Sequence, residues 1–67
     1  MSRHGYFVGD VVHVQIGRVV PFGALIEPLD GFDGLIVTKA GLESGSVVRV
    51  RIAEIDEENR RMRLTRA

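Results

Sequence analysis

Two segments of this chain share one pattern, Gly-x-Val-Val-x-Val-x-Ile, at residues 9–16 and 45–52. In each of them apolar residues recur at every second position, which is the period of a β-strand with one buried and one exposed face. The buried faces are predicted to carry Val12, Val14 and Ile16 in the first segment and Val48, Val50 and Ile52 in the second. The outer faces then carry Val11, His13, Gln15, Arg49 and Arg51. Because the residues that follow the two segments differ at once, we interpret them as two strands with similar roles and not as a duplication.

Three shorter segments also have the composition of strands. Residues 23–27 are apolar, residues 35–38 are rich in β-branched side chains, and residues 60–66 place Met62 and Leu64 inward with Arg61 and Arg63 outward. We also expect Val19 to continue the buried side of the first strand after an irregularity at Gly17.

The connections between these strands are short and polar. Residues 30–34 contain Asp and Gly, and residues 56–59 read Asp-Glu-Glu-Asn, so both are predicted to be turns. Residues 39–45 are too few for a stable helix, so we expect a turn or a single helical turn between the third and fourth strands.

The sequence Val20-Pro21-Phe22-Gly23 marks a sharp corner between the first two strands. Pro21 has a fixed φ and no N–H to donate, so it belongs at a strand end. Gly23 permits a tight bend or a close approach of another backbone. Phe22 lies between these two residues and is expected to be exposed, where it would either contact a ligand or cover the end of the fold.

Five strands without a convincing helix, in a chain of 67 residues, predict an all-β fold. A two-layer sandwich needs a larger core than this chain supplies, whereas a small five-stranded antiparallel barrel closes its own edges. We assign this barrel to residues 8–67 and treat residues 1–7 as a flexible N-terminal lead-in. With no cysteine in the chain, no disulfide stabilises the barrel.

The composition also limits the chemistry. Two histidines and no cysteine do not make a usual zinc site, and no nucleophile–base pair or phosphate-binding loop is present. We therefore expect a protein that is not an enzyme and has neither a metal nor another cofactor. No apolar run is long enough to span a bilayer, and no hydrophobic signal follows Met1, so we expect a cytoplasmic protein without a membrane partner.

The net charge of the chain is zero, but the charges are not evenly distributed. Six of the nine Lys and Arg residues follow Val48, which makes the last two strands the basic side of the molecule. A neutral chain has little non-specific attraction for nucleic acid, so any such contact would depend on this local excess.

Several of these pieces, taken in order, resemble the S1 RNA-binding domain, the repeat of the large ribosomal protein of that name that also occurs in polynucleotide phosphorylase. The similar segments are Val8–Val12, Val19–Ala24, Gly34–Ile36, Val50–Asp56 and Arg61–Leu64. The Pro-Phe-Gly-Ala corner and the Glu-Ile-Asp…Arg ending are the most specific. The resemblance implies an oligonucleotide-binding (OB) barrel that binds single-stranded RNA with little sequence specificity in translation or RNA metabolism. We expect a monomer, with the ribosome or an RNA-processing protein as a further partner.

The resemblance also implies which residues contact RNA. Phe22 matches an aromatic residue that stacks on a base, and Asp56 and Arg61 match an aspartate and an arginine near the end of the domain. Leu25 and Val37 stand where the family usually has a second aromatic residue and a histidine. The chain also lacks most of the long segment that the family places between the third and fourth strands.

Two basic residues, Lys39 and Arg63, complete the predicted RNA-binding set, and Arg63 is expected to contact phosphate. Stacking of one base on an aromatic side chain contributes about 1–3 kcal/mol, so the loss of two stacking groups predicts weak binding.

Simpler interpretations stay open. The arginines could be only the solvated face of half-buried strands, and Asp56 could serve mainly to cap its turn. If Leu25, Val37, Ile36 and Val11 are exposed, they form an apolar patch that suits a protein partner. The alternative function is therefore a protein–protein interaction module on the same barrel, with RNA binding largely lost.

Overall fold

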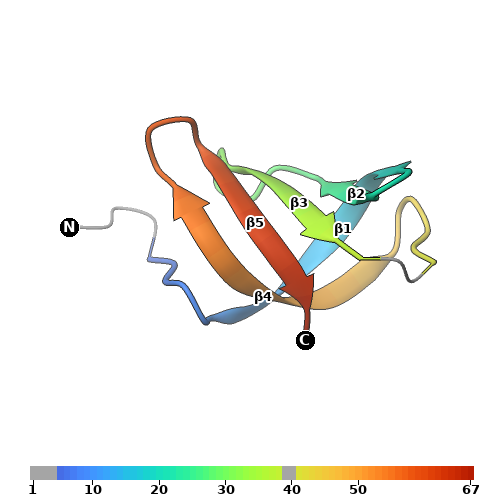
Figure 1. The fold of residues 1–67 in the computed structure, drawn as a ribbon, viewed down its shortest axis with the longest axis horizontal. Coiled ribbons are helices and arrows are strands. Elements are labelled where there is room, and N and C mark those ends of the chain that lie inside the picture. Colours follow the sequence, from blue (N-terminus) through green and yellow to red (C-terminus); the bar gives the residue numbers. More distant parts are fainter. Residues whose placement is uncertain (1–4, 39–40) are drawn as a thin grey trace.

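The computed structural model describes residues 5–38 and 41–67, and in this part of the chain five β-strands form a closed barrel (Figure 1). The strands are β1 (Val11–Val20), β2 (Gly23–Ile26), β3 (Asp33–Val37), β4 (Val47–Asp56) and β5 (Arg61–Arg66). Their order around the barrel is β1-β2-β3-β5-β4, and β4 pairs with β1 to close the sheet. The described residues contain no helix, so the predicted all-β barrel is confirmed.

Four of the five strand pairings are antiparallel, but β3 and β5 run parallel. The prediction of five antiparallel strands is therefore corrected at this one pairing. The reason is geometric, because a closed ring with an odd number of strands cannot alternate in direction at every neighbour. The parallel pairing places residues 33–36 of β3 beside residues 61–64 of β5.

Among the described residues, ten apolar side chains fill the interior, and they come from every strand and from one connection. They are Val14, Ile16, Ala24, Ile26, Phe32, Ile36, Val50, Ile52, Met62 and Leu64. This set includes six of the nine residues predicted to lie on the buried side; Val12 and Val48 pack partly buried against it, and Val19 is exposed. The period of two thus assigned the core correctly over residues 12–16 of β1 and 48–52 of β4.

The irregularity expected at Gly17 is present, but Val19 is not buried as predicted. The register of β1 against β2 shifts between Ile16 and Arg18. One extra residue in a strand exchanges the faces of the residues that follow it, and Val19 is accordingly the Cα partner of the fully buried Ala24. Val19 is nevertheless 46% exposed, because it lies at the end of the barrel beside the turn at residues 21–22.

The connection from β3 to β4 packs against this irregularity. Its described residues form a turn at residues 44–45 and no helical turn. The Gly45 N–H donates to the Ile16 carbonyl at 2.7 Å, and the Ser44 hydroxyl donates to the Gly17 carbonyl at 2.8 Å. The backbone carbonyls of Ile16 and Gly17 on β1 are satisfied in this way.

The described residues that precede β1 also contact the barrel. Tyr6 packs partly buried against the core, and its hydroxyl donates to Asp30 Oδ2 at 2.9 Å, which raises the pKa of Tyr6. The division into a lead-in of residues 1–7 and a domain of residues 8–67 stays a prediction. No helix in residues 5–38 and 41–67 is long and apolar enough to cross a membrane.

Candidate nucleic-acid interface

Phe22 stands at the tip of the β1–β2 hairpin. Pro21 and Phe22 form its two-residue turn, and Val20 and Gly23 are Cα partners on either side. The Phe22 side chain is 61% exposed, which confirms that the corner presents an aromatic ring to solvent. Its position is fixed by Gly23, because a Cβ on Gly23 would overlap the carbonyl oxygen of Ile36 on β3.

The neighbouring surface is formed by the outer side of β2 and β3. Val37 is 51% exposed and is the Cα partner of Gly23, while Leu25 is 40% exposed and pairs with the half-buried Leu35. On the other side of Leu25 lies Arg18 of β1, which is also exposed. Leu25 and Val37 therefore share one surface with Phe22, as the sequence predicted.

Two residues of the predicted apolar patch lie elsewhere. Ile36 is completely buried, because it alternates with Leu35 and Val37 along β3. Val11 is exposed, but it lies on β1 opposite Arg51 of β4 and away from β2 and β3. The patch of four apolar residues was thus wrong for Ile36 and Val11.

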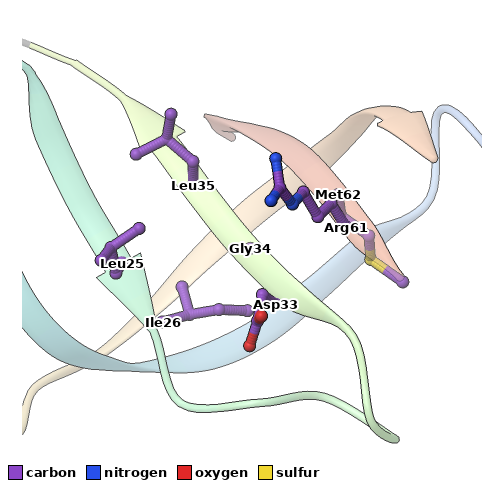
Figure 2. Close-up of a pocket in the computed structure, with 7 residues that line it drawn as sticks. All are labelled: Leu25, Ile26, Asp33, Gly34, Leu35, Arg61 and Met62. Atoms are coloured by element: carbon purple, nitrogen blue, oxygen red, sulfur yellow. The ribbon is translucent and has the colours of Figure 1, made fainter. Parts of the chain in front are cut away.

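The parallel pairing of β3 and β5 brings two arginines to this surface. Arg61 is the Cα partner of Asp33, and Arg63 is the partner of Leu35. A groove of about 460 Å³ lies on β2, β3 and β5, and Figure 2 shows the residues that line it. It is lined by Leu25, Ile26, Asp33, Gly34, Leu35, Arg61 and Met62. We call the surface made by Phe22, Leu25, Leu35, Val37, Arg61 and Arg63 the β2–β3–β5 face.

Acidic residues of β4 border this face. Nη1 of Arg63 lies 3.2 Å from Oε1 of Glu54, and Arg61 is the Cα partner of Asp56. A second hollow along this border is lined by Leu35, Glu54, Asp56, Arg61, Met62 and Arg63. Each arginine of the face therefore has a carboxylate beside it.

Asp56 caps the turn between β4 and β5. Its carboxylate accepts the side-chain Nδ2–H of Asn59 at 2.9 Å and the backbone N–H of Asn59 at 3.2 Å. These hydrogen bonds, with a smaller effect from the charge of Arg61, hold the pKa of Asp56 below its usual value. The capping interpretation is confirmed, and contact of Asp56 with RNA stays a prediction.

The structure therefore brings together most of the predicted site. Phe22, Leu25, Val37, Arg61 and Arg63 share one face, Asp56 lies at its border, and Lys39 lies outside the described residues.

Sequence reasoning missed three neighbours of the site, Arg18, Asp33 and Leu35. Asp33 and Leu35 could have been predicted, because they alternate along β3 with the buried residues 34 and 36 and therefore lie on the same side as Val37. In residues 5–38 and 41–67, no three His, Asp or Glu side chains are grouped closely enough to hold a metal ion.

A closed five-stranded barrel with one parallel pairing between its third and fifth strands is an OB fold. Two solved structures share this fold. The solution structure of GSP13 from Bacillus subtilis matches with a TM-score of 0.78 and 22% identity, over 90% of this chain and 55% of that chain. The structure of the uncharacterized protein MJ1198 from Methanocaldococcus jannaschii matches with a TM-score of 0.81 and 17% identity, over 92% and 93% of the two chains.

Curated proteins with similar sequences point to the family. The chain is 31% identical over 71 residues to polyribonucleotide nucleotidyltransferase of Parabacteroides distasonis, a match that covers 88% of this chain and 10% of the relative. It is 32% identical over 68 residues to small ribosomal subunit protein bS1 of Streptococcus pneumoniae, covering 85% of this chain and 17% of the relative. No protein-family model matches the chain.

The chain thus spans between about a tenth and a fifth of the length of these relatives. The matched regions are the S1 domain regions of the two kinds of protein, and the solved structures have the same barrel. The chain belongs to the S1-domain family of OB folds.

Proposed function

We propose that this chain is a non-catalytic module that binds single-stranded RNA with little sequence specificity, in translation or RNA metabolism. The observation that carries the proposal is the exposed Phe22 ring beside Leu25, Leu35 and Val37 on one face. A flat aromatic ring at the margin of an OB barrel suits a base of any identity, because every base has a π-face. The names of the relatives, a polyribonucleotide nucleotidyltransferase and a ribosomal protein, support the same class of ligand.

The binding is proposed to be weak. Phe22 is the only aromatic residue of the β2–β3–β5 face as defined above, and Leu25 and Val37 offer apolar contact without a stacking plane. Arg63 is engaged by Glu54, so a phosphate must compete with an internal carboxylate for its guanidinium. A module of this kind acts when a ribosome or an RNA-processing partner raises its effective concentration. We place it in the cytoplasm as a monomer, as expected from the sequence.

The test is a titration of ¹⁵N-labelled protein with a short unstructured oligouridylate, followed by amide chemical shifts at low and then moderate salt. We expect shifts grouped around Phe22, Leu25, Val37 and Arg61, and we expect Phe22→Ala to abolish most of them. The matched control is Phe7→Ala, because Phe7 is 63% exposed and lies before β1, outside the face. Equal effects of the two variants would contradict a specific role of Phe22.

A second candidate function uses the same surface. Leu25 and Val37 are exposed aliphatic residues in contact range of the hairpin tip, and together with Phe22 they form an apolar surface that suits a protein partner. Absence of any shift at RNA concentrations of about 1 mM would overturn the RNA proposal, because Kd would then exceed about 1 mM and the binding free energy would be weaker than about 4 kcal/mol. The protein-binding function would then be the one to pursue.

A further inference from the structure

The β2–β3–β5 face has little net attraction for a phosphate backbone. Three acidic residues lie beside or within it, Asp33, Glu54 and Asp56, and three arginines lie on or next to it, Arg18, Arg61 and Arg63. The Arg63 guanidinium is already in an ion pair with Glu54. The electrostatic part of the affinity for single-stranded nucleic acid depends on the number of phosphates that basic groups neutralise. This face by itself therefore contributes little electrostatic affinity.

A different part of the barrel has the opposite character. The pairing of β1 with β4 places His13 opposite Arg49 and Val11 opposite Arg51, and all four side chains are exposed. We call the three polar residues, His13, Arg49 and Arg51, the β1–β4 strip. The register places no acidic residue of β1 or β4 between them, since the neighbouring outward residues are Val11, Gln15 and Val47.

The charges of this strip are not compensated within the described residues. Arg51 Nη1 donates to the Gly9 carbonyl at 3.3 Å, an acceptor that carries no net charge. Arg49 makes no ion pair with any residue in 5–38 or 41–67. Asp10, the residue after Gly9, uses its carboxylate to accept the backbone N–H of Phe7 at 2.9 Å. Two guanidinium charges are thus available to an external anion.

The strip continues the β2–β3–β5 face around the barrel. β5 lies between β3 and β4 (Figure 1), and Thr65 of β5 is the Cα partner of Arg51. A strand that crosses β5 at Thr65, two residues beyond Arg63, meets Arg51 next, whereas a crossing at Arg63 itself would meet Glu54. OB folds bind about 4–16 nucleotides, so a longer oligonucleotide can cover both surfaces where a short one cannot.

We propose that the β1–β4 strip binds the phosphate backbone of the same single RNA strand whose bases contact the β2–β3–β5 face. This inference rests on the proposed function. Base contacts are then made on an almost neutral face, and phosphate contacts are made on a basic strip whose two arginines form no ion pair within the described residues. Salt sensitivity of binding then comes from Arg49 and Arg51 more than from Arg63.

The test compares two oligouridylates, one of about 4 and one of about 12 nucleotides. Affinities are measured by fluorescence anisotropy over a series of salt concentrations, with the variant Arg49→Gln/Arg51→Gln. We expect binding of the longer RNA to weaken by about fivefold or more at low salt, and the slope of log K against log salt to fall by about 1.4 for two lost phosphate contacts. Binding of the shorter RNA is expected not to change.

Arg60→Gln is the control, because it removes one positive charge from the turn between β4 and β5, away from the strip. In a parallel titration of the wild-type protein, amides of His13, Arg49 and Arg51 should shift with the longer RNA only. An amide spectrum with unchanged dispersion establishes that each variant is folded.

The outcomes separate the two proposals. If the wild-type protein binds both RNAs and Phe22→Ala weakens both, but the strip variant behaves like Arg60→Gln, the strip inference fails and the proposed function stands. An equal loss for the short and the long RNA also overturns the strip inference, because it removes the dependence on length. If the wild-type protein binds neither RNA, the proposed function itself fails, and the inference fails with it.

Discussion

Nη1 of Arg63 lies 3.2 Å from Oε1 of Glu54, and both side chains are more than half exposed. An exposed ion pair of this kind contributes about 0–1 kcal/mol to stability, so the pair has little importance for the fold. The pair matters for ligand binding, because Glu54 holds Arg63, one of the arginines that are predicted from the sequence to contact RNA. A phosphate group can use Arg63 only by displacing a carboxylate of the same molecule.

The first prediction follows from this competition. Glu54→Gln removes the competing charge, and we expect binding of oligouridylate to tighten by about two- to fivefold at low salt. The slope of log K against log salt should become steeper by about 0.7, the value for one added phosphate contact. The free energy of unfolding should change by no more than about 1 kcal/mol. Glu43→Gln, which removes an exposed acid from the connection between β3 and β4, is the control for net charge. Equal gains in the two variants would mean that only the total charge of the protein matters.

The second prediction concerns the corner that carries Phe22. In Gly23→Ala the new Cβ would overlap the Ile36 carbonyl oxygen, and neither backbone can move away without breaking the β2–β3 pairing. We expect a loss of stability on the order of 1–3 kcal/mol, the usual cost of forcing an extra methyl group into a packed site. Urea unfolding measures it. Gly41→Ala is the control, because a Cβ there meets no atom within 4 Å, and it should change stability little.

Much of the fold could be predicted because it follows from one-dimensional periodicity. Met62, Leu64, Val50 and Ile52 point inward as their alternation required, and Arg61 and Arg63 point outward. A barrel of five strands then follows from short strands joined by short turns.

The failures come from features that depend on the pairing of distant strands. The bulge at Gly17 turns Val19 to the side of the buried Ala24, but alternation alone does not reveal where the barrel ends, so Val19 was expected to be buried and is exposed. A second shift, between Ile52 and Glu54, brings Glu54 beside Arg63. The sequence separates these two residues by a turn and gives no sign of their ion pair.

The third prediction uses the pH dependence of the β4–β5 turn. Asn59 donates two hydrogen bonds to Asp56, and they lower the pKa of Asp56 in the folded protein. A lowered folded pKa gives stability that is present above the unfolded value of about 3.9 and is lost as the pH falls through the folded pKa. Asn59→Ala should therefore raise the pKa of Asp56, and it should destabilise the protein near pH 7 more than in acid.

The pKa of Asp56 can be followed by its ¹³Cγ chemical shift, and stability by urea unfolding at a series of pH values. The control is the double variant Asp56→Asn/Asn59→Ala against Asp56→Asn alone, since the residue at 56 no longer titrates in either. A difference between these two that depends on pH in the same range would show that Asp56 is not the group responsible.

The fourth prediction asks whether the β2–β3–β5 face binds bases. Leu25 stands where the S1-domain family usually has a second aromatic residue. It lies between Arg18 and Leu35 on the outer surface of the barrel. The side chain is 40% exposed and borders the groove of about 460 Å³, so a larger ring at this position can extend outward without entering the core. Leu25→Phe is therefore expected to leave the fold intact and to add a stacking surface near Phe22.

One stacked base contributes about 1–3 kcal/mol, so Leu25→Phe should tighten binding of oligouridylate by roughly 5- to 150-fold. Anisotropy titrations measure the gain, and Val8→Phe adds the same ring at an exposed turn residue before β1 as the control. Because stacking is not electrostatic, the gain should persist when the salt concentration is raised, unlike the gain from Glu54→Gln. A folded Leu25→Phe protein that binds no better than Val8→Phe would exclude Leu25 from the base-binding surface and would favour a protein partner for this face.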